Sequence, residues 1–227
     1  TLFPYTTLFR SNAITEIAQV ALDWCFSITG NYGLAIILFT VIFTALLTPT
    51  RIASVKQSKA TLLLQPQLNE INEKFKGNPE KINAATQELW KKYGINPLAG
   101  CLPTLLQLPI FIAVLSVFRN ISFPEGPASA FLWISNLAEI DPYRILPILA
   151  GVASYLQSWA SGLTKDPKQR TTVMMMPAMM TWICWSQPAS LGIYWAVSQL
   201  AYMAQSLIVG RFITVSPIAE ENADTKK

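Results

Sequence analysis

The stretch GLAIILFTVIFTALLTPT, residues 33–50, runs for eighteen residues without a charged side chain. A helix rises about 1.5 Å per residue, and roughly 20 apolar residues are needed to cross the hydrocarbon core of a bilayer. The length and composition of residues 33–50 therefore predict a transmembrane helix.

Four more stretches without a charge follow in this chain of 227 residues. They predict further spans over residues 97–118, 145–163, 171–187 and 190–210. The whole chain is 52% hydrophobic and only 13% charged, whereas soluble domains carry roughly 25% charged residues. The sequence therefore predicts an all-α membrane protein with five transmembrane helices.

The placement of Lys and Arg predicts how these spans are oriented. Eight Lys or Arg lie between residues 51 and 95, three lie in 164–170, and three lie in 211–227. The outer loop, 119–142, and its border hold only Arg119 and Arg144. Because positive charge accumulates on the cytoplasmic side, we expect the N-terminus outside and the C-terminus in the cytoplasm.

Residues 12–30, before the first span, are predicted to form an amphipathic helix lying flat at the outer membrane interface. Polar Glu16, Gln19 and Asp23 fall on one side of this helix. Its expected apolar face consists of Ile14, Ile17, Ala18, Ala21, Leu22, Cys25 and Phe26.

Residues 52–95 form the long polar segment between the first two spans. The sequence FKGNPEK, residues 75–81, predicts a turn, so we expect an antiparallel helical hairpin on the cytoplasmic side. Counted from Arg51, this segment holds eight Lys/Arg and four Glu, a net charge of +4. It is either a solvated loop or a docking arm for anionic lipid headgroups, a ribosome or a nascent chain, and we favour the docking arm. The tail, 214–227, is polar and expected to be disordered.

The first eleven residues, TLFPYTTLFRS, have an unusual origin. They are the translation, without a mismatch, of a common sequencing-library adapter. We therefore interpret residues 1–11 as an adapter artefact and exclude them from reasoning about the fold.

The chain shows no arrangement of residues that is typical of an enzyme site. The chain has no His, which removes His-based triads and most zinc sites. Cys25, Cys101 and Cys184 lack metal-ligand spacing and are predicted to be small apolar packing residues. No glycine-rich phosphate loop is present. We expect no enzymatic activity, no cofactor, no metal and no direct nucleic-acid partner.

Three further stretches carry a specific resemblance. They are YGINPLAGCLPTLLQLPIF at 93–111, DPYRILPILAG at 141–151 and PASLGIYWAVSQL at 188–200. In this order and spacing, over residues 31–213, the chain resembles the YidC/Oxa/Alb family of membrane-protein insertases. The resemblance implies a bacterial plasma-membrane protein whose partners are nascent membrane proteins and the lipid bilayer. The Sec translocon and the ribosome are further candidate partners.

The resemblance also implies a polar groove that is open to the cytosol and to lipid. Such a groove would hold the hydrophilic part of a substrate while the apolar helix slides into the bilayer. The family uses the positions of Thr40, Gln157 and Trp195 in its groove. The polar residues of the spans that we expect to line it are Thr40, Thr44, Gln107, Gln157, Tyr194, Trp195, Ser198 and Gln199, with Arg51 at the groove mouth.

Each of these residues also has a structural interpretation. Ser and Thr in spans often bond their own helix, and Gln often joins neighbouring helices. Tyr and Trp can belong to an interfacial aromatic belt, and both interpretations remain open for Trp195. The methionines of the fourth span are either a flexible apolar slide for substrates or plain packing; they are Met174, Met175, Met176, Met179 and Met180.

The sequence departs from the family at Thr44. Many members carry Arg or Lys there, whereas here Arg51 lies seven residues later, about 10 Å along a helix. We therefore predict that hydration matters more than charge attraction, and that Thr44→Arg selectively increases insertion of substrates with acidic tails. A small transporter or lipid-handling protein and a pure assembly chaperone are the alternative functions.

Overall fold

The computed structural model describes residues 11–93, 112–118, 121, 123–165 and 170–212. Within these ranges the chain is helical, with one isolated bridge between Phe131 and Ile134 in place of any strand. The predicted all-α class is confirmed. Besides a short helical segment at 112–118, the α-helices are α1 (Ser11–Thr29), α2 (Tyr32–Leu46), α3 (Thr48–Leu63), α4 (Gln65–Lys74), α5 (Pro79–Lys92), α7 (Ile145–Ala160), α8 (Arg170–Cys184) and α9 (Ala189–Phe212), and the 3₁₀-helix η2 is Leu163–Lys165.

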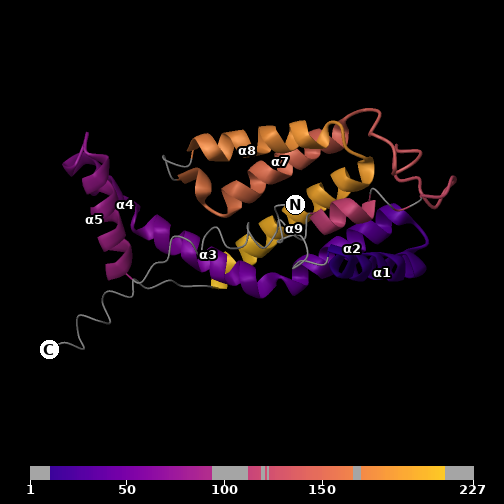
Figure 1. Ribbon diagram of the computed structural model, residues 1–227, viewed down its shortest axis with the longest axis horizontal. Helices are drawn as coiled ribbons and strands as arrows, with labels where there is room; N and C mark the ends of the chain where they lie inside the picture. Colours follow the sequence, from indigo (N-terminus) through magenta and orange to yellow (C-terminus); the bar gives the residue numbers. More distant parts are fainter. Residues whose placement is uncertain (1–10, 94–111, 119–120, 122, 166–169, 213–227) are drawn as a thin grey trace, which may run out of the picture.

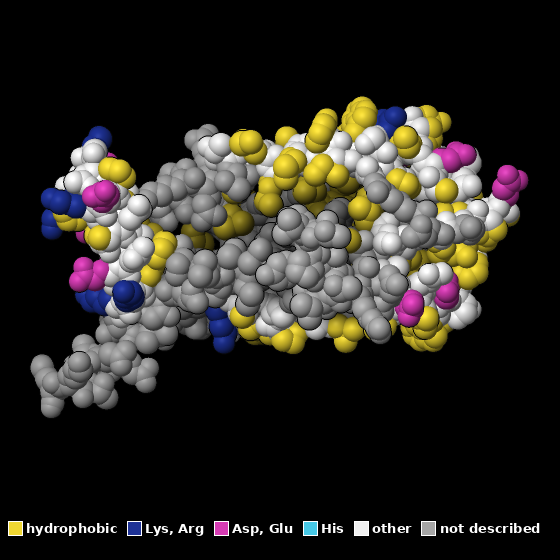
Figure 2. Space-filling model, in the orientation of Figure 1, with side chains coloured by type: hydrophobic (Ala, Val, Ile, Leu, Met, Phe, Trp, Pro, Cys, Tyr) yellow, Lys and Arg dark blue, Asp and Glu magenta, His cyan; other side chains and the backbone are white. Residues whose placement is uncertain are grey.

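Helix α9 lies at the centre of the molecule (Figure 1). It packs against α7 on one side and α2 on the other, α8 covers α7, and α1 covers α2. Helices α4 and α5 contact each other at one end of the elongated molecule, and the connection 123–144 lies at the opposite end. In Figure 2 most charged side chains of the visible face gather at these two ends, while the described surface between them is mainly hydrophobic.

A break at Leu47 separates α2 from α3 and bends the chain by 57°. Pro49 explains the break, because its nitrogen has no hydrogen to donate to the preceding turn and its ring disfavours a continuous helix. Residues 48–50, expected to end the first span, therefore begin α3.

No helix among the described residues is by itself both long and apolar enough to cross a membrane. Helices α2 and α3 together reach that length and composition, and two shorter apolar helices cover Ile145–Ala160 and Val173–Cys184. Helices begin and end close to the expected boundaries over 145–163, 171–187 and 190–210. The count of five transmembrane helices stays a prediction, and most of the expected span 97–118 lies outside the described residues.

Helix α1 was expected to have one apolar face, but apolar side chains lie on two of its sides. Leu22 and Cys25 are buried in the core that α1 forms with α2 and with residues 112–118. Ile17, expected on the same face, is 70% exposed. It shares an exposed apolar side of the helix with Val20, Trp24 and Ile28. The helix therefore has one apolar side against protein and a second one that no described residue covers.

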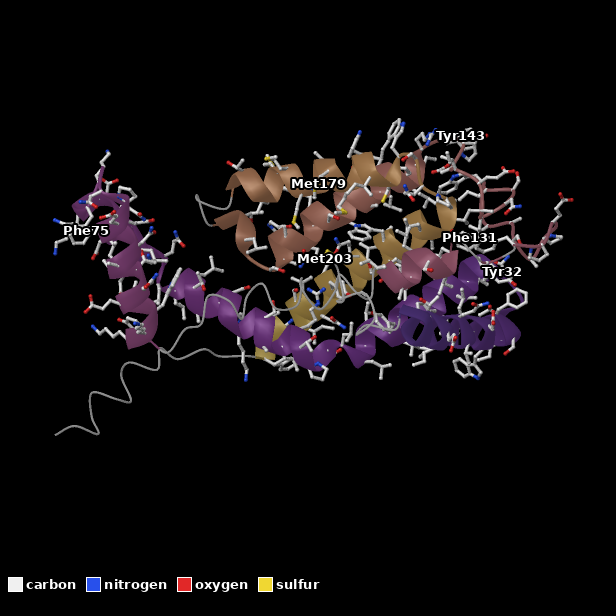
Figure 3. The ribbon with its side chains drawn as sticks, in the orientation of Figure 1. Tyr32, Phe75, Phe131, Tyr143, Met179 and Met203 are labelled. Atoms are coloured by element: carbon white, nitrogen blue, oxygen red, sulfur yellow. The ribbon has the colours of Figure 1, made fainter. Side chains whose placement is uncertain are left out.

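The connection 123–144 closes one end of the molecule over the helix starts. Asn31 caps α2, accepting hydrogen bonds from the amides of Gly33 and Leu34, and its own amide donates to the carbonyls of Pro127 and Ala130. The ring of Phe131 lies directly on Gly33, where a Cβ atom would be 2.3 Å from the ring. Figure 3 shows Phe131 and Tyr32 at this end, far from Phe75 in the turn after α4.

Asp141 holds the start of α7 within the same connection. Its carboxylate is buried and accepts hydrogen bonds from the amide of Leu146 at 2.7 Å, the amide of Tyr143 at 3.0 Å and the indole of Trp133 at 2.9 Å. Burial alone would raise the pKa of Asp141, but the hydrogen bonds to the charged form outweigh it, so the pKa lies below its ordinary value.

Candidate functional site: a polar seam between α2, α7 and α9

Polar side chains at helical spacing line the facing sides of α2–α3, α7 and α9. We call this set the polar seam. Each helix repeats them three or four residues apart, which places them on one face. The seam consists of Thr40, Thr44 and Thr48 from α2–α3, Ser154, Gln157, Ser158 and Ser161 from α7, and Ser198, Gln199, Tyr202, Gln205 and Ser206 from α9.

One half of the seam joins α7 to α9. The amide of Gln199 donates to the hydroxyl of Ser154 at 3.0 Å. Two turns along, the hydroxyls of Ser161 and Ser206 lie 3.3 Å apart, and the amide of Gln157 donates to Ser161 at 2.9 Å. Polar contacts thus link these two helices at two levels.

The other half joins α9 to the α2–α3 junction. The side-chain amide of Gln205 donates to the carbonyl of Thr44 at 2.8 Å and to the hydroxyl of Thr48 at 3.1 Å. Its oxygen is buried and has no hydrogen-bond partner among the described residues. Gln205 therefore contacts both helices of the junction and keeps one acceptor unused there.

Thr40 and Thr44 are fully buried, and their hydroxyls bond their own helix. Thr40 donates to the carbonyl of Ile36 at 2.6 Å, and Thr44 donates to the carbonyl of Thr40 at 2.8 Å. Ser198 likewise donates to the carbonyl of Trp195 at 2.8 Å. The structural interpretation of these hydroxyls therefore applies in this conformation, although each oxygen can still accept a hydrogen bond.

Arg51, the expected groove mouth, lies in α3 at the end of the seam. Its guanidinium carbon is 3.5 Å from the centre of the Tyr202 ring, a cation–π contact. None of the seam residues themselves is charged, and Arg51 places a cation beside Tyr202 at one end of the seam.

The aromatic pair of α9 lies apart from the polar contacts. Tyr194 is buried in the apolar core, where its ring meets the ring of Phe118 edge to face at 6.0 Å. Trp195 is partly buried and packs on the same core and on Ala150 and Ala196. Gln107 lies outside the described residues.

Several seam residues were missed by sequence reasoning, namely Thr48, Ser154, Ser158, Ser161, Tyr202, Gln205 and Ser206. Their spacing was the available signal. Ser154, Ser158 and Ser161 recur at i, i+4 and i+7, and Tyr202, Gln205 and Ser206 continue the turn pattern of Ser198 and Gln199.

Four of the five methionines of α8 lie on the surface, and Met180 is partly buried. Met174, Met175, Met176 and Met179 are between 43% and 65% exposed, which argues against plain packing in the protein interior. Cys25 and Cys184 are buried, as predicted, and Cys101 lies outside the described residues. Within the described residues no group of three or more acidic, His or Cys side chains could hold a metal ion.

Comparison with known proteins agrees with the helical arrangement. The sequence model of the 60Kd inner membrane protein family matches residues 24–216. A membrane protein insertase YidC from Wolinella succinogenes is 38% identical over 191 residues, which cover 84% of this chain and 35% of that protein. A membrane protein insertase YidC from Caldanaerobacter subterraneus subsp. tengcongensis is 38% identical over 190 residues, which cover 84% of this chain and 90% of that protein.

Among solved structures, an active YidC insertase with its first transmembrane domain resolved has a TM-score of 0.69 and 27% identity, covering 91% of this chain and 47% of that one. The chain spans about a third of the length of the Wolinella relative. Since the family match covers most of the chain, we conclude that the chain belongs to the 60Kd inner membrane protein family, together with the YidC membrane protein insertases.

Proposed function

We propose that this chain forms the core of a membrane-protein insertase. In this proposal the polar seam receives the hydrophilic segment of a nascent membrane protein while its apolar helix leaves sideways into lipid. The observation that carries the proposal is the seam itself, which runs through three helices whose other side chains are mostly apolar. Family membership and the likeness to an insertase structure support it.

The physical reason for such a seam is the cost of dehydrating polar groups. An unpaired polar group in hydrocarbon costs several kcal/mol. Hydroxyls can rotate to donate or accept, and carboxamides can do both at once. A substrate segment that meets Ser154, Gln199 and Gln205 can exchange its lost water for these partners. No energy-coupled step, cofactor or enzymatic activity is needed for this exchange.

The seam has little fixed charge, so we propose that hydration and hydrogen bonding dominate over charge attraction. Thr44, where the family resemblance leads us to expect a cation, is 2% exposed. An Arg placed there would need both space and a counter-charge. Arg51 is engaged with Tyr202 and would meet substrate only at the end of the seam.

The arrangement in the membrane follows from the same reasoning. We propose a bacterial inner-membrane protein with five spans, the connection 123–144 outside, and α4–α5 in the cytoplasm. The separation of α4–α5 from that connection at opposite ends of the molecule supports this orientation (Figure 1). The polar segment 52–95, which carries more Lys than Glu and includes α4 and α5, then serves as a docking arm for headgroups or a ribosome, with the Sec translocon as a further candidate partner.

The surface of α8 offers a path for the apolar part of a substrate. Figure 3 shows Met179 on α8 and Met203 on α9, on the helices that flank α7. Flexible methionine side chains adapt to helices of different shape. The exposure of the α8 methionines supports their interpretation as a flexible apolar slide for substrates over packing in the protein interior.

The test is insertion of a single-span substrate with a short outside tail into proteoliposomes that contain this chain alone, scored by protease protection. Protection should exceed that of empty liposomes. Replacing Gln199 by Leu and Ser154 by Ala together should reduce protection several-fold, whereas the matched change Gln87→Leu on exposed α5 should not. Unchanged insertion combined with impaired folding of the substrate would indicate a chaperone.

A further inference from the structure

The junction between α2 and α3 has an unusual hydrogen-bond arrangement. The last four carbonyls of a helix have no partner within it, and Pro49 has no amide hydrogen with which to continue the turn. The carbonyl of Thr44, in the last turn of α2, instead accepts from the side chain of Gln205. The same amide group reaches Thr48, the first residue of α3. One side chain of α9 thus bridges both sides of the break.

Polar contacts join helix α3 to α9 at several points along its length. Val55 is the one buried residue among the described side chains of α3. Arg51 stacks on Tyr202, which precedes Gln205 by one turn of α9. Farther along, the ammonium group of Lys59 donates to the carbonyl of Gly210. Such contacts can break and re-form more readily than interlocked apolar packing.

The far part of α3 covers one end of the polar seam. Leu62 lies close against Gly162. A Cβ atom added to Gly162 would be 2.6 Å from a methyl carbon of Leu62. Gly162 follows Ser161, which contacts Ser206 of α9. Moving α3 away from α9 would uncover this pair of hydroxyls and the end of the seam.

We propose that the α2–α3 junction is a hinge and that Gln205 is its latch. With the latch closed, the Gln205 amide holds the 57° bend and keeps Arg51 over Tyr202. With the latch open, α3 turns about Leu47 and exposes the seam. The hinge itself needs no substrate, whereas its use as an entrance rests on the proposed insertase function. A polar polypeptide segment opens the latch by competing for the carboxamide of Gln205, whose oxygen is unused among the described residues.

The hinge can be measured without a substrate by the distance between two spin labels. Lys56 on α3 and Ala204 on α9 are both exposed and take labels as cysteines, in a chain whose three native cysteines are replaced by alanine. Lys56 lies nine residues beyond Leu47, about 13 Å along a helix, so a rotation of about 20° moves its label by about 5 Å. A second pair, Leu156 on α7 with Ala204, reports on the α7–α9 packing.

Gln205→Leu should lengthen the mean Lys56–Ala204 distance by about 5 Å and broaden the distribution of that distance, while the Leu156–Ala204 distance stays the same. Gln199→Leu is the matched control, because its amide joins α9 to α7 and not to the junction. An unchanged Lys56–Ala204 distance in Gln205→Leu, or an equal change in Gln199→Leu, would overturn the latch.

A second variant keeps the test decisive if Gln205→Leu disturbs both distances. Thr48→Val preserves the shape of the side chain and removes one acceptor of the Gln205 amide. A longer Lys56–Ala204 distance alone would support the hinge, and no change would contradict it. Because these measurements use no substrate, a failed insertion assay beside a moving hinge would refute the insertase proposal alone.

Discussion

At the residue scale, the carboxylate of Asp141 accepts three hydrogen bonds at the start of α7. A helix N-terminus favours negative charge, because its first amides have no partner within the helix. The buried position and the three donors make this charge a structural one. Asp141 therefore stabilises the junction between the connection 123–144 and α7.

Asp141→Asn should destabilise the fold by about 1.5–3 kcal/mol, the usual value of hydrogen bonds to a charged group. The asparagine oxygen can replace one carboxylate oxygen, but its NH₂ group would face an amide donor. Thermal unfolding in detergent measures the change. Glu139→Gln is the control, because that side chain is exposed and should change stability by less than about 0.5 kcal/mol. Equal effects of the two substitutions would contradict the role of Asp141.

The lowered pKa of Asp141 predicts a pH dependence with a defined sign. A carboxyl whose pKa is lower in the folded state stabilises the fold above its unfolded pKa, close to the ordinary value of 3.8. This stabilisation is lost as the pH falls through the lower, folded pKa. Unfolding temperatures of the original chain and of Asp141→Asn should therefore differ at neutral pH and converge below about pH 4. A constant difference across that range would disprove the assignment.

At the element scale, the packing of α7 on α8 depends on the absence of a side chain at Gly151. A Cβ atom there would be 2.0 Å from the hydroxyl oxygen of Thr181 and 3.1 Å from the carbonyl of Pro177. That hydroxyl donates to the same carbonyl at 3.0 Å. The two helices can approach this closely because a glycine and a threonine meet, as is common between membrane helices.

Gly151→Ala should destabilise the protein by about 1–3 kcal/mol, the usual cost of overpacking. In an exposed helix the same change would stabilise by about 0.5–1 kcal/mol, so the sign itself tests the contact. Thr181→Ala removes the clashing oxygen and should restore much of the loss in the double variant. Additive effects of the two substitutions in thermal unfolding would show that the residues do not interact.

The bend between α2 and α3 belongs to the same scale. Pro49 makes a break expected, but it does not set the angle. The angle is set by what each helix contacts, and α3 contacts α9 through Gln205, Tyr202 and Gly210. Pro49 causes the break locally, whereas contacts with α9 hold its angle, and for this reason we propose that the junction is a hinge.

At the scale of the whole molecule, two charged ends flank a largely apolar surface (Figure 2). Exposed apolar side chains of α7 and α8 include Val152, Trp159, Met175 and Trp182. An exposed apolar surface of this extent is typical of contact with lipid or with another protein. The proposed orientation places the two ends on opposite sides of the membrane.

This orientation predicts the reactivity of cysteines placed at the two ends. Glu125 in the connection 123–144 and Glu80 in α5 are both exposed. In intact cells a membrane-impermeant maleimide should label Glu125→Cys and leave Glu80→Cys unlabelled, in a chain without its native cysteines. Permeabilised cells, in which both sites should react, are the control. The opposite labelling pattern would show that the chain has the reverse of the proposed topology.

The residues that define each helix could be found from the sequence. Asn31 and Asn78 begin helices, Pro49 breaks one, and the turn at 75–78 was expected from Gly77 and its neighbours. These features depend on contacts within one or two turns, so the local sequence contains them. The all-α class and the family follow from the same kind of pattern.

The tertiary structure alone decided which polar side chains meet. Gln205 contacts Thr44 across 161 residues, and Gln199 contacts Ser154 across 45 residues. The spans are apolar on nearly all sides, so their hydrophobic pattern does not reveal which face turns inward. Sequence reasoning accordingly found Gln199 but missed its partner Ser154, and it missed Gln205 altogether. The sequence by itself determined the helical class and the position of most described helices, although it placed 48–50 at the end of a span instead of at the start of α3. The rotation and crossing of the helices, set by packing such as Gly151 on Thr181, determined the polar seam.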